Sequence, residues 1–384
     1  MLKGLRVVDF SRFLPGPYAS QRLADLGAEV IKIESPGSGD PTRTRGGGLV
    51  YSAVNRNKKS ITLNLKEPEG QQLAFRLTHK ADVVIESFRP GIAKAMGIGF
   101  EAVKRENPGV IYCSLTGFGQ SGPLSKLGSH DLNYLALSGV LAQLKDETGR
   151  PVQPSFQFAD MIGGIAASEA VLAALVQRSL TNQGCYLDIA MTDTLIGMMS
   201  VHAVIQSVTG TGQGIAELTG DIIAYRIYET ADGKYVSLSA LEQKFWKNFC
   251  RAVGRDEWIA DIFSPADPAN NTFNELTALF KSRTFTEWAK FSLAVDCCLA
   301  PVLETDDLIH SSYVKDKGLA VDIRTEACGL WRQMATSAGG FNPKKPGPGN
   351  ALPPALGQHN QEVLTGLLGA TAAQIGDWQL RGII

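Results

Sequence analysis

Short apolar runs alternate with segments of helical spacing along the first 116 residues. The apolar runs predict strands, at residues 5–10, 30–33, 60–65, 81–85 and 110–115. The intervening segments predict helices, at residues 18–26, 67–78 and 100–105. Such alternation is typical of a parallel sheet with helices on both faces. The first part of the chain is therefore predicted to be a doubly wound α/β domain.

The next hundred residues continue this pattern and end in a glycine-rich segment. Helical spacing and one further apolar strand pattern follow, at residues 134–144, 160–177, 185–189 and 193–208. Residues 209–214 alternate glycine with polar residues, which indicates a linker. We therefore place the N-terminal part of a large domain at residues 1–210.

A smaller α+β domain is predicted after the linker. Residues 224–229 and 234–238 alternate in strand fashion on either side of a hairpin turn. Three helical patterns and a returning strand follow, at residues 241–253, 272–281, 286–293 and 298–303. We place this small domain at residues 211–325 and expect the C-terminal segment, 326–384, to return to the large domain.

The charge balance excludes some classes of function. The 384 residues include 37 basic and 38 acidic ones, a net charge of -1, which argues against a general nucleic-acid or membrane-surface binder. The six cysteines lack the CxxC spacing of a metal site, so we expect reduced thiols, a cytoplasmic location and no bound metal. The most apolar run, 162–176, is short and contains Ser168 and Glu169, and no signal peptide or membrane span is expected.

Candidate chemistry gathers between residues 128 and 164. His130 and Asp131 precede one predicted helix, and Asp160 precedes another. Imidazole titrates near neutral pH, and a carboxylate at a helix start is held by backbone donors, so this combination suits proton transfer. The competing interpretation is structural, because a single histidine is more often packed or exposed than catalytic, and Asp160 is a good N-cap for the helix after it.

Basic side chains indicate where an anionic ligand would bind. Arg43, Lys58 and Lys59 flank a run of three glycines at 46–48. Such a loop can close over phosphates, although a solvated loop has the same composition. Arg89 follows a predicted strand, at the edge where open α/β sheets bind ligands, and there its guanidinium would suit a phosphate or a carboxylate.

Two local motifs have simple structural interpretations. Residues 117–122 match the GxGxxG pattern of dinucleotide sites, but Pro123 follows where a helix should begin, so a tight glycine turn is favoured. Ser239 and Glu242 match a helix capping box, which explains Glu242 without any catalytic role.

Several longer motifs resemble the family III CoA-transferase and α-methylacyl-CoA racemase superfamily. They occur in order along nearly the whole chain, at residues 4–9, 15–17, 26–34, 57–60, 88–91, 116–119 and 356–359. The segment Gly128-Ser129-His130-Asp131-Leu132-Asn133-Tyr134 resembles the racemase branch, which usually has a His-Asp pair followed by Asn-Tyr, whereas transferases typically lack the histidine.

The resemblance implies roles for the candidate residues. Asp160 matches the carboxylate of both branches, a proton-transfer group in racemases and the nucleophile in transferases. His130 and Glu242 match the racemase pair in which a carboxylate orients the imidazole. A larger set is expected to contact the CoA or acyl parts of the substrate: Arg89, Lys58, Lys59, Asn57, Arg43, Tyr134 and Phe13.

The resemblance also implies an assembly. It implies an α/β fold in which both chain ends form a large Rossmann-like domain and a small α+β domain is inserted between them. Two subunits would interlock as rings in a homodimer, with each active site between the large domain of one subunit and the small domain of the other. The implied partners are an acyl-CoA thioester and a second copy of the chain. No separate cofactor is expected, because CoA enters as part of the thioester.

The favoured activity is racemisation of an α-methylacyl-CoA. Inverting the carbon next to a thioester needs two bases on opposite faces, for which we assign His130, oriented by Glu242, and Asp160. A backbone amide near Asp131 would stabilise the enolate. The main alternative is CoA transfer, in which Asp160 attacks an acyl-CoA to form an anhydride. An NAD-dependent oxidoreductase and a catalytically silent CoA-binding protein are weaker alternatives, and the acyl group stays open.

Overall fold

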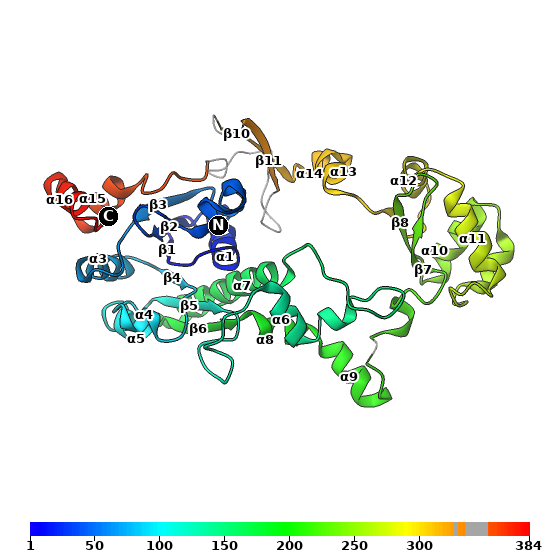
Figure 1. The fold of residues 1–384 in the computed structure, drawn as a ribbon, viewed down its shortest axis with the longest axis horizontal. Helices are drawn as coiled ribbons and strands as arrows, with labels where there is room; N and C mark the ends of the chain where they lie inside the picture. The colour runs from blue at the N-terminus through cyan, green and yellow to red at the C-terminus, as the bar shows by residue number, and fades with distance from the viewer. Residues whose placement is uncertain (213, 326–328, 335–351) are drawn as a thin grey trace. The chain divides into compact units, whose positions relative to one another are not determined.

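The computed structural model describes residues 1–212, 214–325, 329–334 and 352–384. The chain divides into two compact units, whose secondary structure is labelled in Figure 1. Met1–Met199 and Ser312–Ile384 form one, the large unit, and Ser200–Ser311 form the other, the small unit.

A six-stranded parallel sheet forms the centre of the large unit, so the predicted doubly wound α/β class is confirmed. Its strands are β1 (Arg6–Asp9), β2 (Glu29–Glu34), β3 (Lys58–Thr62), β4 (Val83–Glu86), β5 (Ile111–Thr116) and β6 (Cys185–Ala190). They lie in the order β3-β2-β1-β4-β5-β6, and all neighbours are parallel. The strand order reverses between β1 and β4, so a ligand crevice is expected at the carboxyl ends of these two strands.

Helices cover both faces of the sheet, because successive side chains of a strand point to opposite sides. One face includes Val8 and Tyr112 and packs against α3 (Pro68–Thr78), α4 (Ile92–Ala95), α5 (Phe100–Glu106), α15 (Asn360–Leu368) and α16 (Ala372–Leu380). The other includes Val7 and Cys113 and packs against α1 (Pro15–Asp25), α6 (Asp131–Ser138), α7 (Phe158–Thr181) and α8 (Met191–Met198). Figure 1 shows α7 lying along the sheet beside β5 and β6.

The helix α7 is a core element of the large unit. By length and composition alone it would pass as a membrane span. In the structure Ala167, Val171 and Ala174 are buried in the cluster between α7 and the sheet. Arg22 Nε donates to Ser168 Oγ over 2.9 Å and links α1 to the same helix.

The end of the chain packs beside the outer strand β3. Ser60 N donates to His359 Nδ1 over 3.1 Å, Thr62 N donates to Asn360 Oδ1 over 2.8 Å, and Asn64 N donates to the Ile383 carbonyl over 2.7 Å. Residues before this segment form α14 (Ser312–Lys317) and an antiparallel pair, β10 (Ala320–Thr325) and β11 (Gly329–Met334). The glycine- and proline-rich stretch at 339–354 lies mostly outside the described residues.

The small unit has its own sheet and aromatic core. The predicted hairpin is confirmed as β7 (Tyr225–Glu229) and β8 (Tyr235–Ser239), with β9 (Leu299–Pro301) beside β8. Its helices are α9 (Ser200–Thr209), α10 (Gln243–Ala252), α11 (Asn271–Lys281), α12 (Phe285–Ala294) and α13 (Thr305–His310). The buried Trp246, Phe280 and Trp288 lie in its core, and both indole N–H groups donate to backbone carbonyls, as buried tryptophans require.

Two predictions of helix starts are wrong. Asp160 is not the N-cap of α7, because the helix begins at Phe158 and Gln157 is its N-cap. Ser239 and Glu242 do not form a capping box. Ser239 pairs with Tyr225 as the last residue of β8, while Glu242 is itself the N-cap of α10 and makes no side-chain cap bond. Sheet pairing holds Ser239 extended and so overrides the local motif.

Two predicted helices are also shorter than expected. α6 ends at Ser138, because Gly139 adopts a left-handed φ of 85°, and a 3-10 turn at Leu141–Gln143 follows. The single helix predicted at 193–208 is divided at Met199 into α8, in the large unit, and α9, in the small unit.

Candidate active site

The two ends of the stretch 128–164 meet at the starts of α6 and α7. Asp131 is the first residue of α6, and its Oδ1 accepts a hydrogen bond from the Asp160 backbone amide over 3.0 Å. Asp160 lies in the first turn of α7. The predicted neighbours His130, Asp131 and Asp160 are therefore held together by one contact between two helix starts.

His130 is the N-cap of α6 and presents its imidazole to solvent. Its backbone amide donates to Asn133 Oδ1 over 3.1 Å, as part of a capping box between these two residues. The His130 side chain is exposed. The backbone is thus fixed while the ring stays available to a ligand.

Asp160 is a partly buried carboxyl group that holds a proton unusually well. Burial, and then the nearby Asp131 carboxylate, raise its pKa to about 7. A helix start favours the ionised form, so here desolvation outweighs the helix dipole. Near neutral pH both protonation states are populated, which suits a group that must take up and release a proton.

Tyr134 is a buried support for the His130 segment. Its hydroxyl donates to the Ser129 carbonyl over 2.9 Å, and its ring centroid lies 5.3 Å from that of Phe118. A Cβ at Gly117 would lie 2.3 Å from the Tyr134 ring, so glycine makes room for the tyrosine. Residues 117–130 form turns and bends with no helix, which confirms the predicted glycine turn.

Arg89, which follows β4, lies beside this segment. It is exposed, and its Nη2 lies 3.0 Å from where a Cβ on Gly128 would be. Phe13, in the loop after β1, is exposed and has a left-handed φ of 67°, which is rare for an aromatic residue and is often found at functional sites. Arg12 precedes it and was missed by the sequence analysis, although it follows β1 as directly as Arg89 follows β4.

Other residues that were predicted to contact CoA lie near β2 and β3 and bond to groups of the protein itself. The Lys58 ammonium is buried and donates over 2.8 Å to Ser20 Oγ, Asn55 Oδ1 and the Pro17 carbonyl. Burial lowers the pKa of Lys58 to about 7, against the attraction of Asp9. Lys58 therefore holds the start of α1 and does not face solvent.

The remaining members of that set are also paired within the protein. Lys59 bridges Glu29 and Glu362, at 2.6 and 2.7 Å. Arg43 donates from Nε and Nη2 to the Glu34 carboxylate, in both cases over 2.7 Å. Asn57 Nδ2 donates to Asp25 Oδ1 over 3.2 Å. Of the predicted anion-binding residues, Arg89 is the one placed beside the His130 segment.

Glu242 lies in the small unit, at the start of α10. Its side chain is exposed and accepts no hydrogen bond from any described residue. Because Glu242 does not form the predicted capping box, its carboxylate is available for another contact.

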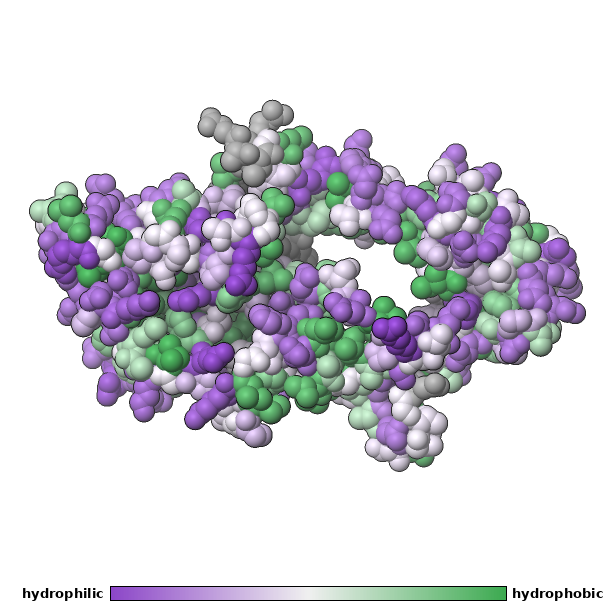
Figure 2. Space-filling view, viewed as in Figure 1, coloured by the Kyte–Doolittle hydropathy of each residue, from purple (hydrophilic) through white to green (hydrophobic). Residues whose placement is uncertain are grey.

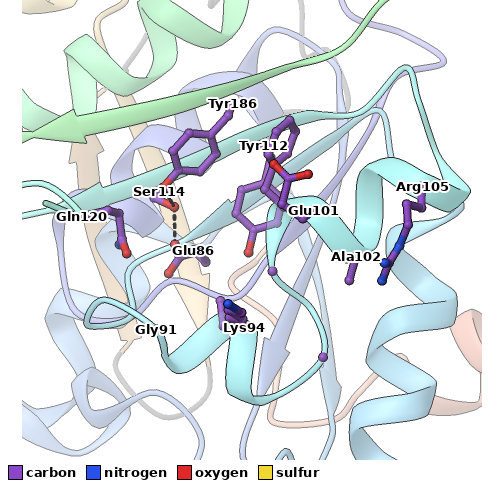
Figure 3. A pocket seen from close by; sticks show the side chains of 14 residues that line it. Glu86, Gly91, Lys94, Glu101, Ala102, Arg105, Tyr112, Ser114, Gln120 and Tyr186 are labelled. Carbon is purple, nitrogen blue, oxygen red and sulfur yellow. Dashed lines mark hydrogen bonds between the residues drawn. The ribbon is translucent and has the colours of Figure 1, made fainter.

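A cavity of about 630 Å³ lies elsewhere in the large unit, on the face of the sheet that includes Tyr112 (Figure 3). Sequence reasoning missed its buried carboxyl group, Glu86. Glu86 accepts hydrogen bonds from Ser114 Oγ and, over 2.6 Å, from the Phe88 amide, while Tyr186 donates to Ser114 over 3.1 Å. Burial raises the pKa of Glu86 to about 7. The cavity is thus separate from the site around Asp160, which lies on the opposite face.

The described residues contain no group of three or more His, Cys, Asp or Glu side chains arranged to hold a metal ion. An imidazole and two carboxyl groups lie at the starts of α6 and α7.

Comparisons with known proteins bear on this site. The family described as CoA-transferase family III matches residues 2–360. Human succinyl-CoA:glutarate CoA-transferase is 30% identical, covering 100% of this chain and 90% of the relative. Human α-methylacyl-CoA racemase is 32% identical, covering 83% and 81%. The crystal structure of a CAIB/BAIF family protein from Brucella suis has a TM-score of 0.77 at 29% identity, covering 95% of this chain and 99% of that one.

Proposed function

The chain belongs to CoA-transferase family III, and from this premise we propose that it is an α-methylacyl-CoA racemase that inverts the methyl-bearing α-carbon next to the thioester. Transferases and a racemase are similar to it at nearly equal identity, so the choice between the two reactions rests on the site.

The observation that supports racemisation is that His130 and a protonatable Asp160 lie at the starts of two helices that contact each other. A racemase needs one base to remove the α-proton and a second group, already protonated, to return a proton to the opposite face. His130 presents an exposed imidazole, and the carboxyl of Asp160, with its pKa near 7, exchanges protons at neutral pH. A carboxylate nucleophile, in contrast, works best when it is fully ionised.

The enolate formed between the two proton transfers needs a donor for its oxygen. The amide of Asp131, the first residue of α6, has no acceptor within the helix, because the first backbone N–H groups of any helix lack one. We assign this amide to the thioester oxygen, where one well-placed donor is worth about 3 kcal/mol.

We further propose that the chain works as an interlocked homodimer in which the small domain is an insertion in the large one and Glu242 of one subunit orients His130 of the other. Exposed apolar side chains support a partner surface. They include Leu137, Val176, Leu180, Ile196 and Met198 in the large unit and Val201, Val204 and Val208 on α9 of the small unit. Figure 2 shows apolar side chains at the surface around α6 and α8.

CoA transfer is the second candidate. The match over the whole of this chain to a human CoA-transferase favours it. Asp160 would then attack the thioester, forming an anhydride and releasing CoA. CoA would attack the aspartyl carbonyl and displace the donor acid, and the aspartyl thioester would pass CoA to an acceptor carboxylate. This reaction has no step for His130.

The test is α-proton exchange of 2-methylacyl-CoA thioesters in D2O, followed by NMR. We expect the wild type to lose the α-proton signal and His130→Ala to lose at least about 100-fold in exchange rate. His310→Ala, at an exposed histidine of α13, is the matched control and should exchange normally. Absence of exchange across several acyl chains, together with CoA transfer to an added carboxylic acid, would replace racemisation by the second candidate.

A further inference from the structure

Two loops meet where the strand order reverses between β1 and β4. Arg12 N, after β1, donates to Ser87 Oγ, after β4, over 3.1 Å. The ring centroids of Phe10 and Phe88 lie 6.5 Å apart beneath this contact. A third segment joins them, because Arg89 lies against Gly128, two residues before His130. The carboxyl edge of the sheet at the switch point is therefore continuous with the His130 segment.

Two guanidinium groups at this edge have no carboxylate partner. Arg12 is exposed, with its guanidinium carbon 5.7 Å from the Phe88 ring centroid, and neither Arg12 nor Arg89 bonds a carboxylate in the ranges that the structure describes. Some other arginines of the large unit are paired with carboxylates, as Arg6 is with Glu29, Arg43 with Glu34 and Arg178 with Asp82. Stacking on Phe88 restrains the Arg12 fork while leaving its N–H donors to solvent.

The loop that presents Arg12 is held rigidly at both ends. Lys32 Nζ donates to the Ser11 carbonyl over 2.9 Å, and Lys58 Nζ donates to the Pro17 carbonyl over 2.8 Å. A Cβ on Gly16 would lie 2.2 Å from Ser11 Cβ, so the loop is also tightly closed. Two buried ammonium groups and a left-handed Phe13 therefore fix the backbone that carries Arg12, and a preorganised loop of this kind is expected where a ligand binds.

We propose that Arg12 and Arg89 form an anion-binding subsite at the switch point between β1 and β4, which holds anionic oxygens of the thioester substrate. The oxygens belong either to a CoA phosphate or to a carboxylate at the far end of the acyl group, since a guanidinium fork binds both. The subsite rests on the proposed acyl-CoA substrate but not on the choice between racemisation and transfer.

Calorimetric titration of the full-length protein tests the subsite without relying on turnover. The ligands are CoA, 2-methylbutanoyl-CoA and the 2-methylglutaryl thioester of CoA, whose acyl group ends in a carboxylate. The variants are Arg12→Gln, Arg12→Lys and the control Arg105→Gln, which removes the same charge from an exposed position on α5. We expect Arg12→Gln to raise Kd about tenfold, Arg12→Lys to restore part of that loss, and the control to bind as the wild type does.

The three ligands identify the source of the anion. A tenfold loss for all of them assigns Arg12 to a CoA phosphate, and a loss confined to the glutaryl thioester assigns it to the acyl carboxylate. Equal binding by Arg12→Gln and the control for every ligand overturns the subsite. If Arg12→Gln weakens binding while the wild type exchanges no α-proton, the racemase proposal fails and the subsite stands. If the wild type binds none of the three, both fail.

Discussion

Two carboxyl groups of the large unit, Asp160 and Glu86, share a pKa near 7 for the same first reason, which is burial, yet they lie in different kinds of surroundings. Glu86 lies in a cavity but accepts hydrogen bonds from Ser114 and the Phe88 amide, so its oxygens already hold the chain after β4 in place. Asp160 has the like charge of Asp131 beside it, and no described donor bonds its carboxyl group. A raised pKa therefore does not identify a reactive group by itself. The lack of hydrogen-bond donors distinguishes Asp160.

The strongest test of this comparison is to replace each carboxyl by its amide. Asp160→Asn should lower α-proton exchange by about 10²- to 10⁴-fold, because the amide cannot carry the proton. Glu86→Gln should keep exchange within about threefold of the wild type, since Glu86 lies on the opposite face of the sheet. Equal losses in the two variants would contradict the distinction. Exchange rates measured by NMR at pH 7 decide between these outcomes.

The pH dependence of stability should include one contribution from Asp160 and a second from Glu86. The pKa of Glu86 is about 7 in the folded state and 4.5 in the reference state, so the folded protein binds more protons between these values and stability falls as pH rises through that window. The loss is at most about 3 kcal/mol, at 1.36 kcal/mol per pKa unit. Glu86→Gln should flatten the fall, measured by urea unfolding from pH 4.5 to 7.5. An unchanged slope would contradict the assignment. Lys58, whose pKa is also about 7 in the folded state, releases its proton in the upper part of this range, so the fall is compared between pH 4.5 and about 6, where Lys58 is mostly protonated in both states.

A smaller effect is expected from filling the space at Gly117. In Gly117→Ala the new methyl group meets the Tyr134 ring, so we expect a loss of about 1–3 kcal/mol and slower exchange as the His130 segment shifts. Gly366→Ala is the control, because a Cβ on this glycine of α15 would have no described heavy atom within 4 Å, and alanine should stabilise α15 by up to about 1 kcal/mol. Thermal unfolding and exchange rates of both variants test this, and equal stability of the two would show that Tyr134 can move without cost.

The smallest expected effect concerns the charge of Asp131. Asp131→Asn retains an oxygen for the Asp160 amide but removes the like charge, so the pKa of Asp160 should fall by less than about one unit. The acidic limb of the pH profile of kcat/KM should move to lower pH by the same amount. A limb that stays in place or moves to higher pH would show that burial alone sets the proton affinity of Asp160.

Much of the fold followed from local patterns. Every strand predicted in the first 116 residues is present. A strand that is buried on both faces tends to be a short apolar run, and such a run can be recognised in the sequence without knowledge of the fold. The prediction of a capping box at Ser239 was wrong because Ser239 pairs with Tyr225 of β7, and the local pattern does not reveal this pairing.

The candidate site could be predicted only in part from local sequence patterns. The sequence named His130, Asp131 and Asp160, and the structure joins the last two through one hydrogen bond. The sequence did not show that Lys58 is buried and Lys59 is not, although neighbouring residues on a strand point to opposite sides. It also overlooked Arg12 and Glu86, whose surroundings come from segments far apart in the chain.

The sequence by itself determined the alternation of strands and helices, the α/β class and the short list of residues able to move a proton, because periodicity and side-chain chemistry are local properties. The tertiary structure alone decided which cations are buried in ion pairs, which carboxyl group is satisfied and which is left to react, and which loops meet at the switch point. Those outcomes depend on burial and on neighbours brought together by the sheet, since solvent exclusion and nearby charge set both proton affinity and access to a ligand.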